Sequence, residues 1–280
     1  MPAESRNPYV ESDGTPKLRR SVVAFIDILG YMDLVKSTTS NDRQALLARL
    51  HKALNLSRQQ VDPNHSDDTL QKLRDKDFSA FRAFTDNIVI GQPIRYDGEI
   101  ELGSVFDSVS YFQMLMTMEG FFVRGAIAIG DLYMDDIAVF GAGLIEAYEA
   151  ETTLARDPRI VLSPSAQVAV NRHLEYYGRG AHAPQNRDLL RDSDGQYFVN
   201  YLDTLIPEDG YFYEQELAAH KARIEEKLVL LRSRPSVWTK YLWAANYHNY
   251  WCDQNSCVDS SMKIDTENFQ LMPARLVPDA

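Results

Sequence analysis

The stretch Ser21–Asp27 reads Ser-Val-Val-Ala-Phe-Ile-Asp, and the interpretation of the whole chain starts from it. Its apolar run predicts a buried strand that ends on an aspartate. A second aspartate, Asp86, follows Phe84-Thr85 and precedes Asn87 and the apolar run Ile88-Val89-Ile90. A carboxylate at the end of a buried strand is costly unless it is paired, protonated or bound to a metal. Two of them on adjacent strands predict a cage of oxygen ligands for Mg²⁺ or Mn²⁺, which points to phosphoryl chemistry.

Outward from this stretch, the apolar periodicity predicts alternating strands and helices. A helix is expected over 41–60, a hairpin over 78–94 with its turn at 85–87, a helix over 102–118 and a strand over 121–129. Further α/β units follow. This order is the ferredoxin-like βαββαβ pattern, an α+β fold in which helices back an antiparallel sheet.

The composition changes along the chain and divides it into three parts. Residues 1–17 are polar and predict a flexible leader, 18–206 form the α/β domain, and 207–280 form a C-terminal helical extension. Two amphipathic segments, 214–231 and 235–252, predict a helical hairpin in this extension. The second is rich in Trp and Tyr, and we expect these rings to pack on the domain or across an oligomer interface rather than to stack on bases.

The overall charge limits the kinds of partner. A formal net charge of −11 repels a phosphate backbone, so nucleic-acid binding is not expected. It does not exclude a small triphosphate, because bound divalent ions invert the local charge. No stretch approaches the roughly 20 apolar residues of a membrane span, and the N-terminus lacks a signal-peptide core. We therefore expect a cytoplasmic protein without a membrane partner.

Three segments carry a resemblance to a known family. They are Ala24–Gly30, Arg82–Asp86, and the long run Arg124–Glu151, which reads RGAIAIGDLYMDDIAVFGAGLIEAYEAE. In this order and spacing they resemble the class III nucleotide cyclases over roughly residues 20 to 200. They are most similar to the bacterial pyrimidine nucleotide cyclases of the Pycsar anti-phage system.

The resemblance implies a metal site and a reaction. Asp27 and Asp86 match the two metal-binding aspartates of the family, and the carbonyl of Ile28 matches a usual third ligand. Two Mn²⁺ or Mg²⁺ ions per active site would lower the pKa of the ribose 3′-hydroxyl and neutralise the leaving pyrophosphate. Backbone amides of Leu29, Gly30 and Tyr31 are expected to hold the β- and γ-phosphates.

The resemblance also bears on the choice of base. Arg82 occupies the place where purine cyclases typically carry a lysine that reads the base, and Ala138 occupies the place of the second reader. The usual pair of residues that reads a purine base is therefore missing. Because arginine offers only donors, it suits the O2 and O4 acceptors of uracil better than the amino edge of cytosine, which favours UTP over CTP. A solvated strand residue is the alternative interpretation of Arg82.

Two positions depart from the family pattern. The usual Asn and Arg on the helix after Gly141 are replaced by Ile145 and Glu149. Loss of such an arginine costs about 10³-fold in rate if nothing replaces it. Arg124 is a possible substitute, although a residue in this place more often braces the strand.

The resulting hypothesis is a homodimeric pyrimidine nucleotide cyclase that makes cyclic UMP or cyclic CMP from UTP or CTP. By resemblance, its active sites lie between two protomers, and its product is a second messenger that switches on a separate effector protein during phage infection. One rival is a degenerate cyclase-homology domain that binds nucleotide or mediates dimerisation. A purine cyclase is the other rival, and Ala138 disfavours it.

Overall fold

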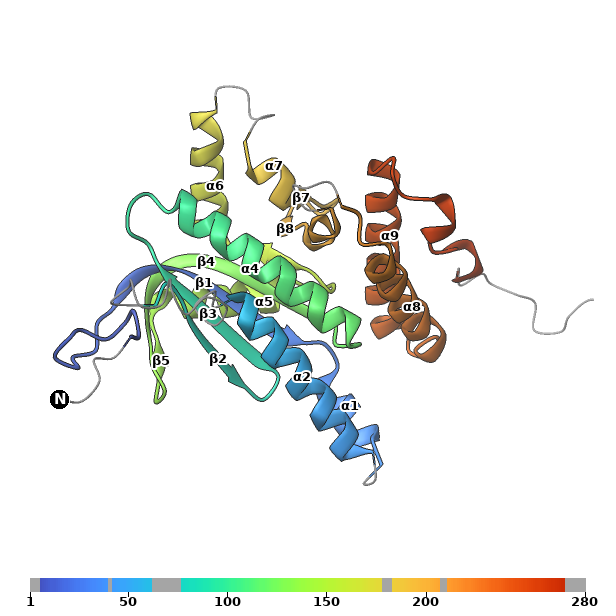
Figure 1. Ribbon diagram of the computed structural model, residues 1–280, viewed down its shortest axis with the longest axis horizontal. Helices are drawn as coiled ribbons and strands as arrows, with labels where there is room; N and C mark the ends of the chain where they lie inside the picture. The colour runs from blue at the N-terminus through green and yellow to red at the C-terminus, as the bar shows by residue number, and fades with distance from the viewer. Residues whose placement is uncertain (1–5, 40–41, 62–76, 178–182, 207–210, 270–280) are drawn as a thin grey trace, which may run out of the picture.

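The computed structural model describes residues 6–39, 42–61, 77–177, 183–206 and 211–269 (Figure 1). The strands are β1 (Arg19–Ile28), β2 (Ala80–Phe84), β3 (Asn87–Pro93), β4 (Val123–Met134), β5 (Val139–Phe140), β6 (Ile160–Leu162), β7 (Leu189–Arg191) and β8 (Tyr197–Val199). The α-helices are α1 (Tyr31–Ser37), α2 (Arg43–Val61), α4 (Glu99–Met118), α5 (Ala142–Leu154), α6 (Pro164–Tyr176), α7 (Gln185–Asp188), α8 (Glu214–Leu230) and α9 (Pro235–Gln254). Short 3₁₀ helices are η3 (Tyr201–Leu205), η4 (Ser260–Met262) and η5 (Glu267–Phe269).

Seven strands form one sheet in the order β2-β3-β1-β4-β6-β8-β7, and β5 pairs with β4 off this path. Strand β1 lies at the centre of the core, antiparallel to β3 on one side and to β4 on the other. The β2–β3 hairpin is antiparallel as well. The α+β class and the ferredoxin-like βαββαβ order expected from the sequence are therefore confirmed.

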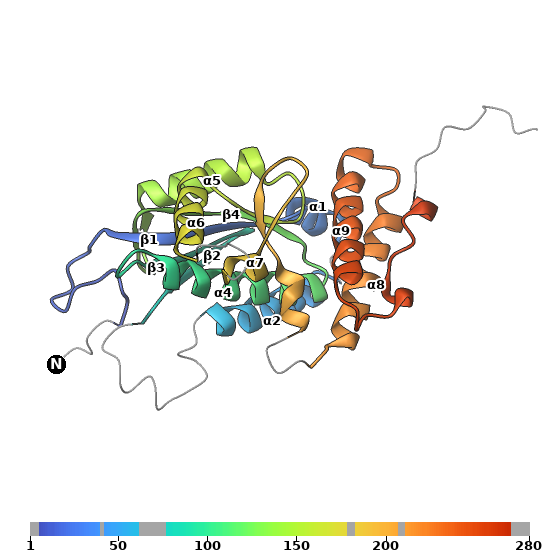
Figure 2. The same ribbon diagram turned by 90° about the horizontal axis from the view of Figure 1, so that it is seen from above.

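Helices cover both faces of the sheet (Figure 2). Along β1, Val22, Ala24 and Ile26 pack in the cluster that includes α4, whereas Val23 and Phe25 pack in a second cluster with α5. Because successive side chains of a strand point to opposite faces, a strand buried on both sides must be apolar throughout. This explains the unbroken apolar run before Asp27.

Helix α5 lies very close to β4, and two glycines allow it. A Cβ at Gly130 would stand 2.6 Å from the Cα of Gly143, and a Cβ at Gly143 would stand 3.0 Å from the carbonyl carbon of Gly130. Neither space admits a side chain without a shift of the backbone. The run that resembled the family thus contains the contact that seats α5 on the sheet.

The predicted C-terminal helical hairpin is present as α8 and α9 (Figure 1). The large rings of α9 that are buried are Trp238, Tyr241, Tyr247 and Trp251. Phe122, next to β4, meets Tyr241 edge-on with ring centroids 5.0 Å apart. Packing on the domain, the interpretation that the sequence favoured, accounts for the aromatic stripe.

The expected flexible leader instead packs on the domain over residues 6–17. Tyr9 is fully buried and its hydroxyl bonds the Ser21 hydroxyl at 2.9 Å. Asn7 donates from Nδ2 to the Met134 carbonyl at 2.9 Å. A polar composition concealed one anchoring ring, while residues 1–5 of the predicted leader lie outside the described residues.

Candidate functional site

The fold brings the two aspartates of the sequence analysis to one end of the central strands. Asp27 lies in β1 opposite Asn87 of β3 and Arg124 of β4. Asp86 lies in the turn between β2 and β3, and its carbonyl accepts the Ile28 amide at 2.9 Å. Because β3 is the direct neighbour of β1, the hairpin turn and the end of β1 meet there.

Burial and charge act in opposite directions on Asp27. Burial raises the pKa of its carboxyl group, the hydrogen bond and charge of Arg124 lower it, and the charge of Asp86 raises it again. The net pKa is raised. The charges of the two carboxylates thus oppose each other, and a cation held between them would relieve that repulsion.

Arg124 stands between two carboxylates. Its Nε lies 3.1 Å from Asp27 Oδ2 and 2.8 Å from Glu151 Oε1. Burial also raises the pKa of Glu151, and Arg124 opposes this. Within the described residues, the buried Glu151 Oε1 accepts no well-aligned hydrogen bond. Sequence reasoning missed the role of Glu151, because only the close seating of α5 on β4 brings it to Asp27.

The turn that carries Asp86 is held in an uncommon conformation. Thr85 has φ +56°, a left-handed backbone that a β-branched residue rarely adopts. Its hydroxyl donates to Asp86 Oδ1 at 2.8 Å. Such strain costs on the order of 1–3 kcal/mol and concentrates at functional sites. The conformation orients the carboxylate of Asp86.

The side chains around Asp27 and Asp86 supply few ligands for a metal ion. In the described part of the chain, no group of three or more His, Cys, Asp or Glu side chains is arranged to hold an ion. The candidate clamp has only two such side chains, Asp27 and Asp86, with the carbonyl of Ile28 as the third ligand implied by the resemblance. Hard oxygen donors and the mutual repulsion of Asp27 and Asp86 fit a divalent cation, and Glu151, paired with Arg124, adds a further carboxylate nearby.

The turn expected to hold phosphates is only partly suited to that role. Gly30 has φ +72° and precedes α1, so the chain turns sharply there. The amide of Leu29, however, already donates to the Phe122 carbonyl at 2.8 Å. In this conformation the pairing of Leu29 with Phe122, next to β4, uses that donor, so phosphate binding by the Leu29 amide stays a prediction that would require this bond to break. The Tyr31 side chain packs against the main core.

The two candidate base-reading positions lie near each other. Arg82 of β2 donates from Nε to the Asp135 carbonyl at 2.5 Å and pairs with the Asp136 carboxylate. In the same turn, the Ala138 amide donates to Asp135 Oδ1 at 2.7 Å. Asp136 is 94% exposed, so this ion pair is weak and a ligand can replace it. Asp135 caps its own turn, because its Oδ1 also accepts from the Ile137 amide at 2.8 Å.

The two positions that depart from the family pattern face outward. Ile145 is 59% exposed on α5, and Glu149 is exposed on the same helix. They do not contribute to the Asp27 cluster of their own chain. The charge of Lys240 on α9 also lowers the pKa of both Asp27 and Glu151, by less than Arg124 does. The sequence carried no signal for Lys240.

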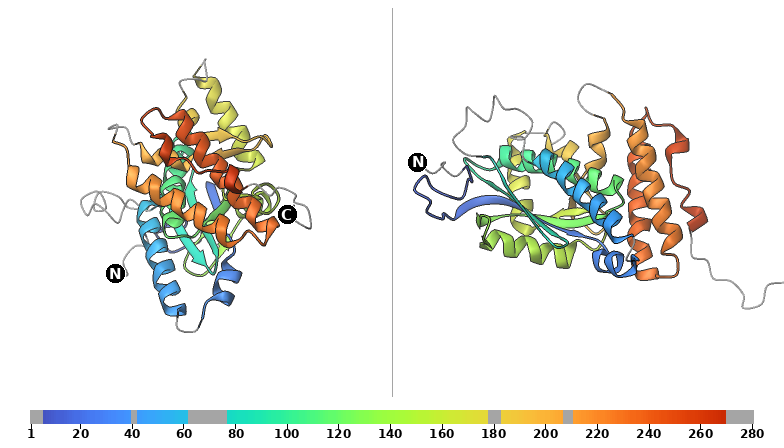
Figure 3. Two further views of the ribbon diagram at one scale, coloured as in Figure 1. Left: turned by 90° about the vertical axis from the view of Figure 1, so that its right-hand side faces the viewer. Right: turned by 60° about the horizontal axis from the view of Figure 1, so that its bottom comes forward.

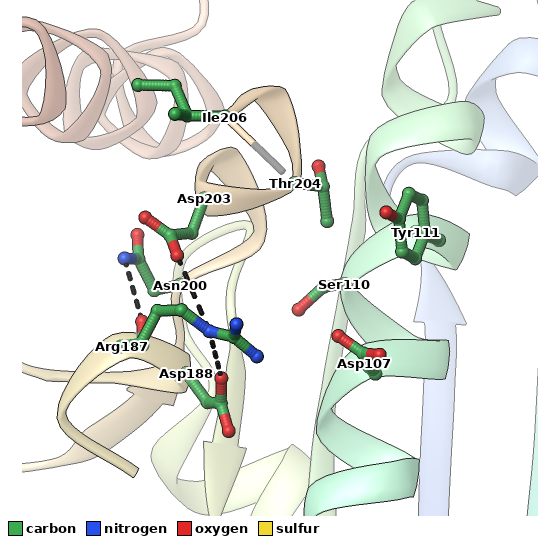
Figure 4. Close-up of a pocket in the computed structure, with 9 residues that line it drawn as sticks. All are labelled: Asp107, Ser110, Tyr111, Arg187, Asp188, Asn200, Asp203, Thr204 and Ile206. Atoms are coloured by element: carbon green, nitrogen blue, oxygen red, sulfur yellow. Dashed lines mark hydrogen bonds and ion pairs between the residues drawn. The ribbon is translucent and has the colours of Figure 1, made fainter. Parts of the chain in front are cut away.

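A separate acidic pocket of about 160 Å³ lies between α4 and the α7–η3 region (Figure 4). Asp107 and Ser110 of α4 face Arg187, Asp188 and Asp203 across it. Arg187 pairs with Asp188 at 3.1 Å and with Asp203 at 3.8 Å. None of the residues singled out from the sequence lines this pocket.

Comparisons with known proteins add little to this geometry. No protein-family description matches the chain, and no curated protein matches its sequence. Among solved structures, it is similar to a class III adenylyl cyclase-like ATP-binding protein from Pseudomonas aeruginosa, with a TM-score of 0.43 and 12% identity. The match covers 70% of this chain and 41% of the other, so this chain spans less than half of that protein. No helix in the described residues is long and apolar enough to cross a membrane.

Proposed function

We propose that the protein is a nucleotide cyclase acting on a pyrimidine nucleoside triphosphate, UTP in preference to CTP. The observation that carries the proposal is the meeting of Asp27 and Asp86 at one end of β1 and β3. In the reaction, the ribose 3′-oxygen forms a bond to the α-phosphorus, pyrophosphate leaves, and the 3′-hydroxyl proton is lost. The products are a 3′,5′-cyclic nucleotide and pyrophosphate.

The residues of the chain have distinct parts in this proposal. Asp27, Asp86 and the Ile28 carbonyl would hold two Mn²⁺ or Mg²⁺ ions, which would activate the 3′-hydroxyl and neutralise the triphosphate. Arg124 lowers the pKa of Asp27 against the effect of burial and orients its carboxylate, and its position beside the site supports it as the substitute for the missing arginine. Arg82 would read the base once it exchanges Asp136 for the ligand.

A homodimer belongs to the same proposal. Large apolar side chains on β2, β5 and α5 are more than half exposed, namely Phe84, Phe140, Ile145 and Tyr148. Contiguous exposed apolar surface is typical of protein–protein contacts, and these four side chains are candidates for such a contact. A second copy would cover them and close the site. That the cyclic product activates a separate effector in anti-phage defence is proposed from the resemblance alone.

The rival proposal is a nucleotide-binding module without turnover. One observation favours it, because Ile145 and Glu149 offer neither of the usual transition-state donors. The purified protein would be incubated with Mn²⁺ and each of ATP, GTP, CTP and UTP, and the products identified by mass. Cyclic UMP or cyclic CMP as the main product supports the cyclase, cyclic AMP makes it a purine cyclase, and binding without product supports the module.

A further inference from the structure

A cavity of about 520 Å³ lies between the turn after β1 and the C-terminal hairpin. Figure 3 shows α1 beside the end of the hairpin at which α8 ends and α9 begins. Leu29 and Gly30, which the sequence assigned to phosphate binding, form part of its wall, and the hairpin forms the facing part. The extension therefore borders the region next to Asp27, although it follows the α/β domain in sequence.

The cavity is positively charged in an acidic protein. Three cationic side chains line it, Lys36 from α1, Lys227 from α8 and Arg234 from the loop before α9. Asp33 is the one acidic residue among those that line it. The whole chain carries a formal net charge of −11, so the local excess of positive charge in this cavity is opposite in sign to that of the chain. It favours an anionic ligand.

Lys227 gives the strongest support for an anionic ligand in this cavity. Its side chain is partly buried, and burial lowers the pKa of its ammonium group; Glu226 raises that pKa, and the charges of Arg49 and Arg223 lower it. In the described part of the chain, Lys227 forms neither a hydrogen bond nor an ion pair through its side chain. A partly buried ammonium group without a partner loses part of its hydration, and an anion in the cavity would offset that loss.

The remaining lining sets the size and character of the ligand. Apolar groups from α1 and the hairpin occupy much of the wall, namely Leu34, Leu230, Leu231, Val237 and Tyr241. The volume lies in the range of pockets that hold organic ligands. Arg234 pairs with Asp33 at 2.6 Å, and both side chains are about half exposed, at 49% and 57%. Such a pair exchanges readily for a stronger anion.

We propose that this cavity binds the phosphate chain of a nucleotide, with Lys227 and Arg234 of the C-terminal hairpin as its contacting cations. The identity of the nucleotide as substrate rests on the proposed function, whereas phosphate binding itself does not. The used Leu29 amide supports the assignment, because the expected backbone cradle lacks that donor and side-chain cations stand at the same place. The extension then belongs to the binding site of its own chain.

The test measures binding of inorganic pyrophosphate, and separately of UTP, to the full chain by calorimetry at low salt with EDTA present. EDTA removes divalent ions, so the heat reports on the cations of the protein alone. Lys227→Gln and Arg234→Gln are each expected to weaken binding about tenfold, the worth of one charge-assisted hydrogen bond. Arg232→Gln is the matched control: it removes a charge from the same hairpin loop at a residue that does not line the cavity.

A variant that is expected to bind more tightly shows that weaker binding in the Gln variants does not come from loss of the fold. Asp33→Asn removes the acidic group of the cavity and frees Arg234, so binding of pyrophosphate should become several-fold tighter. No binding to the wild-type chain, or Gln variants that bind as the wild type does, would overturn the proposal.

The outcomes also separate this proposal from that of the cyclase. If the wild type makes no cyclic product but binds pyrophosphate, and Lys227→Gln weakens that binding, the cyclase assignment fails and the phosphate site stands. If the wild type makes cyclic nucleotide and the two Gln variants keep its KM, the phosphate site fails alone.

Discussion

The Ile28 amide donates to the Asp86 carbonyl at 2.9 Å, and this bond ties the end of β1 to the β2–β3 turn. The donor, Ile28, follows Asp27 directly in the chain, and the acceptor is the backbone carbonyl of Asp86 itself. This bond therefore fixes how far apart the backbones of the two candidate metal ligands lie. A site built on a sheet in this way is stiff, which suits the alignment of reacting atoms.

Asp86→Ala should abolish cyclic-nucleotide formation with little effect on stability. The carboxylate lies in a turn and its removal leaves the backbone bond from Ile28 in place. Product formation with Mn²⁺ is measured together with thermal unfolding. Full activity in this variant would remove Asp86 from the metal site.

Asp27→Asn should separate stability from activity. Burial raises the pKa of Asp27, so folding disfavours its ionised form relative to the unfolded chain, and the stability that the neutral form contributes is lost as pH rises through the raised pKa. Asparagine is neutral at every pH and still accepts from Arg124. In metal-free buffer at pH 7 the variant should melt at a higher temperature than the wild type, yet form no product. A lower melting temperature would show that ionised Asp27 stabilises the fold.

Arg82→Ala should change the choice of base more than the stability. Its ion pair with Asp136 is exposed, and such pairs contribute at most about 1 kcal/mol. The ratio of kcat/KM values among the four triphosphates is the measurement, and Asp136→Asn serves as the control that frees Arg82 without removing it. Unchanged selectivity in Arg82→Ala would mean that Arg82 is not a base reader.

Gly130→Ala should destabilise the fold by about 1–3 kcal/mol, because its Cβ would press on the backbone of α5 at Gly143. Gly103→Ala in α4 is the matched control. A Cβ there meets nothing within 4 Å, and alanine favours a helix by up to about 1 kcal/mol. Both are measured by urea denaturation, and equal stability of the two variants would contradict the tight seating of α5.

The C-terminal hairpin should lose stability in acid because of a buried histidine pair. His248 Nε2 donates to the Met262 carbonyl at 2.8 Å, so the Nδ1 of neutral His248 accepts from His220 Nδ1 at 2.9 Å. The second nitrogen of His220 then accepts from the Tyr201 hydroxyl at 2.8 Å. This chain of bonds requires both rings to be neutral.

Burial lowers the pKa of His248 to about 4, its bond to Met262 raises it and Lys221 lowers it, while burial and His248 lower that of His220. Because the folded pKa lies below the ordinary value, stability falls as pH drops from about 6.5 to about 4, by roughly 3 kcal/mol for His248 alone. Denaturant unfolding at pH 7 and pH 5 measures this loss. His248→Gln should shrink the difference and His51→Gln, at an exposed residue of α2, should not. If the stability difference between pH 7 and pH 5 is the same in His248→Gln as in the wild type, the buried histidine pair does not cause the loss of stability in acid.

The sequence alone was enough to determine the core topology. Strand β1 is buried on both faces, and its unbroken apolar run, the hairpin around Asp86 and the helical periodicities are local signals. They reflect the burial that each residue needs, which depends on its chemistry and its place in a short repeat. The two aspartates were found for the same reason, because a charge beside a buried strand is rare.

Tertiary structure alone decided which groups surround those aspartates. Glu151 reaches Arg124 only because Gly130 and Gly143 let α5 lie on β4, and Tyr9 folds back onto Ser21 over the sheet. Lys227 and Arg234 face Gly30 only because the hairpin packs on Phe122. These contacts join residues far apart in sequence, and their energy depends on close packing and low local polarity, which no local pattern encodes.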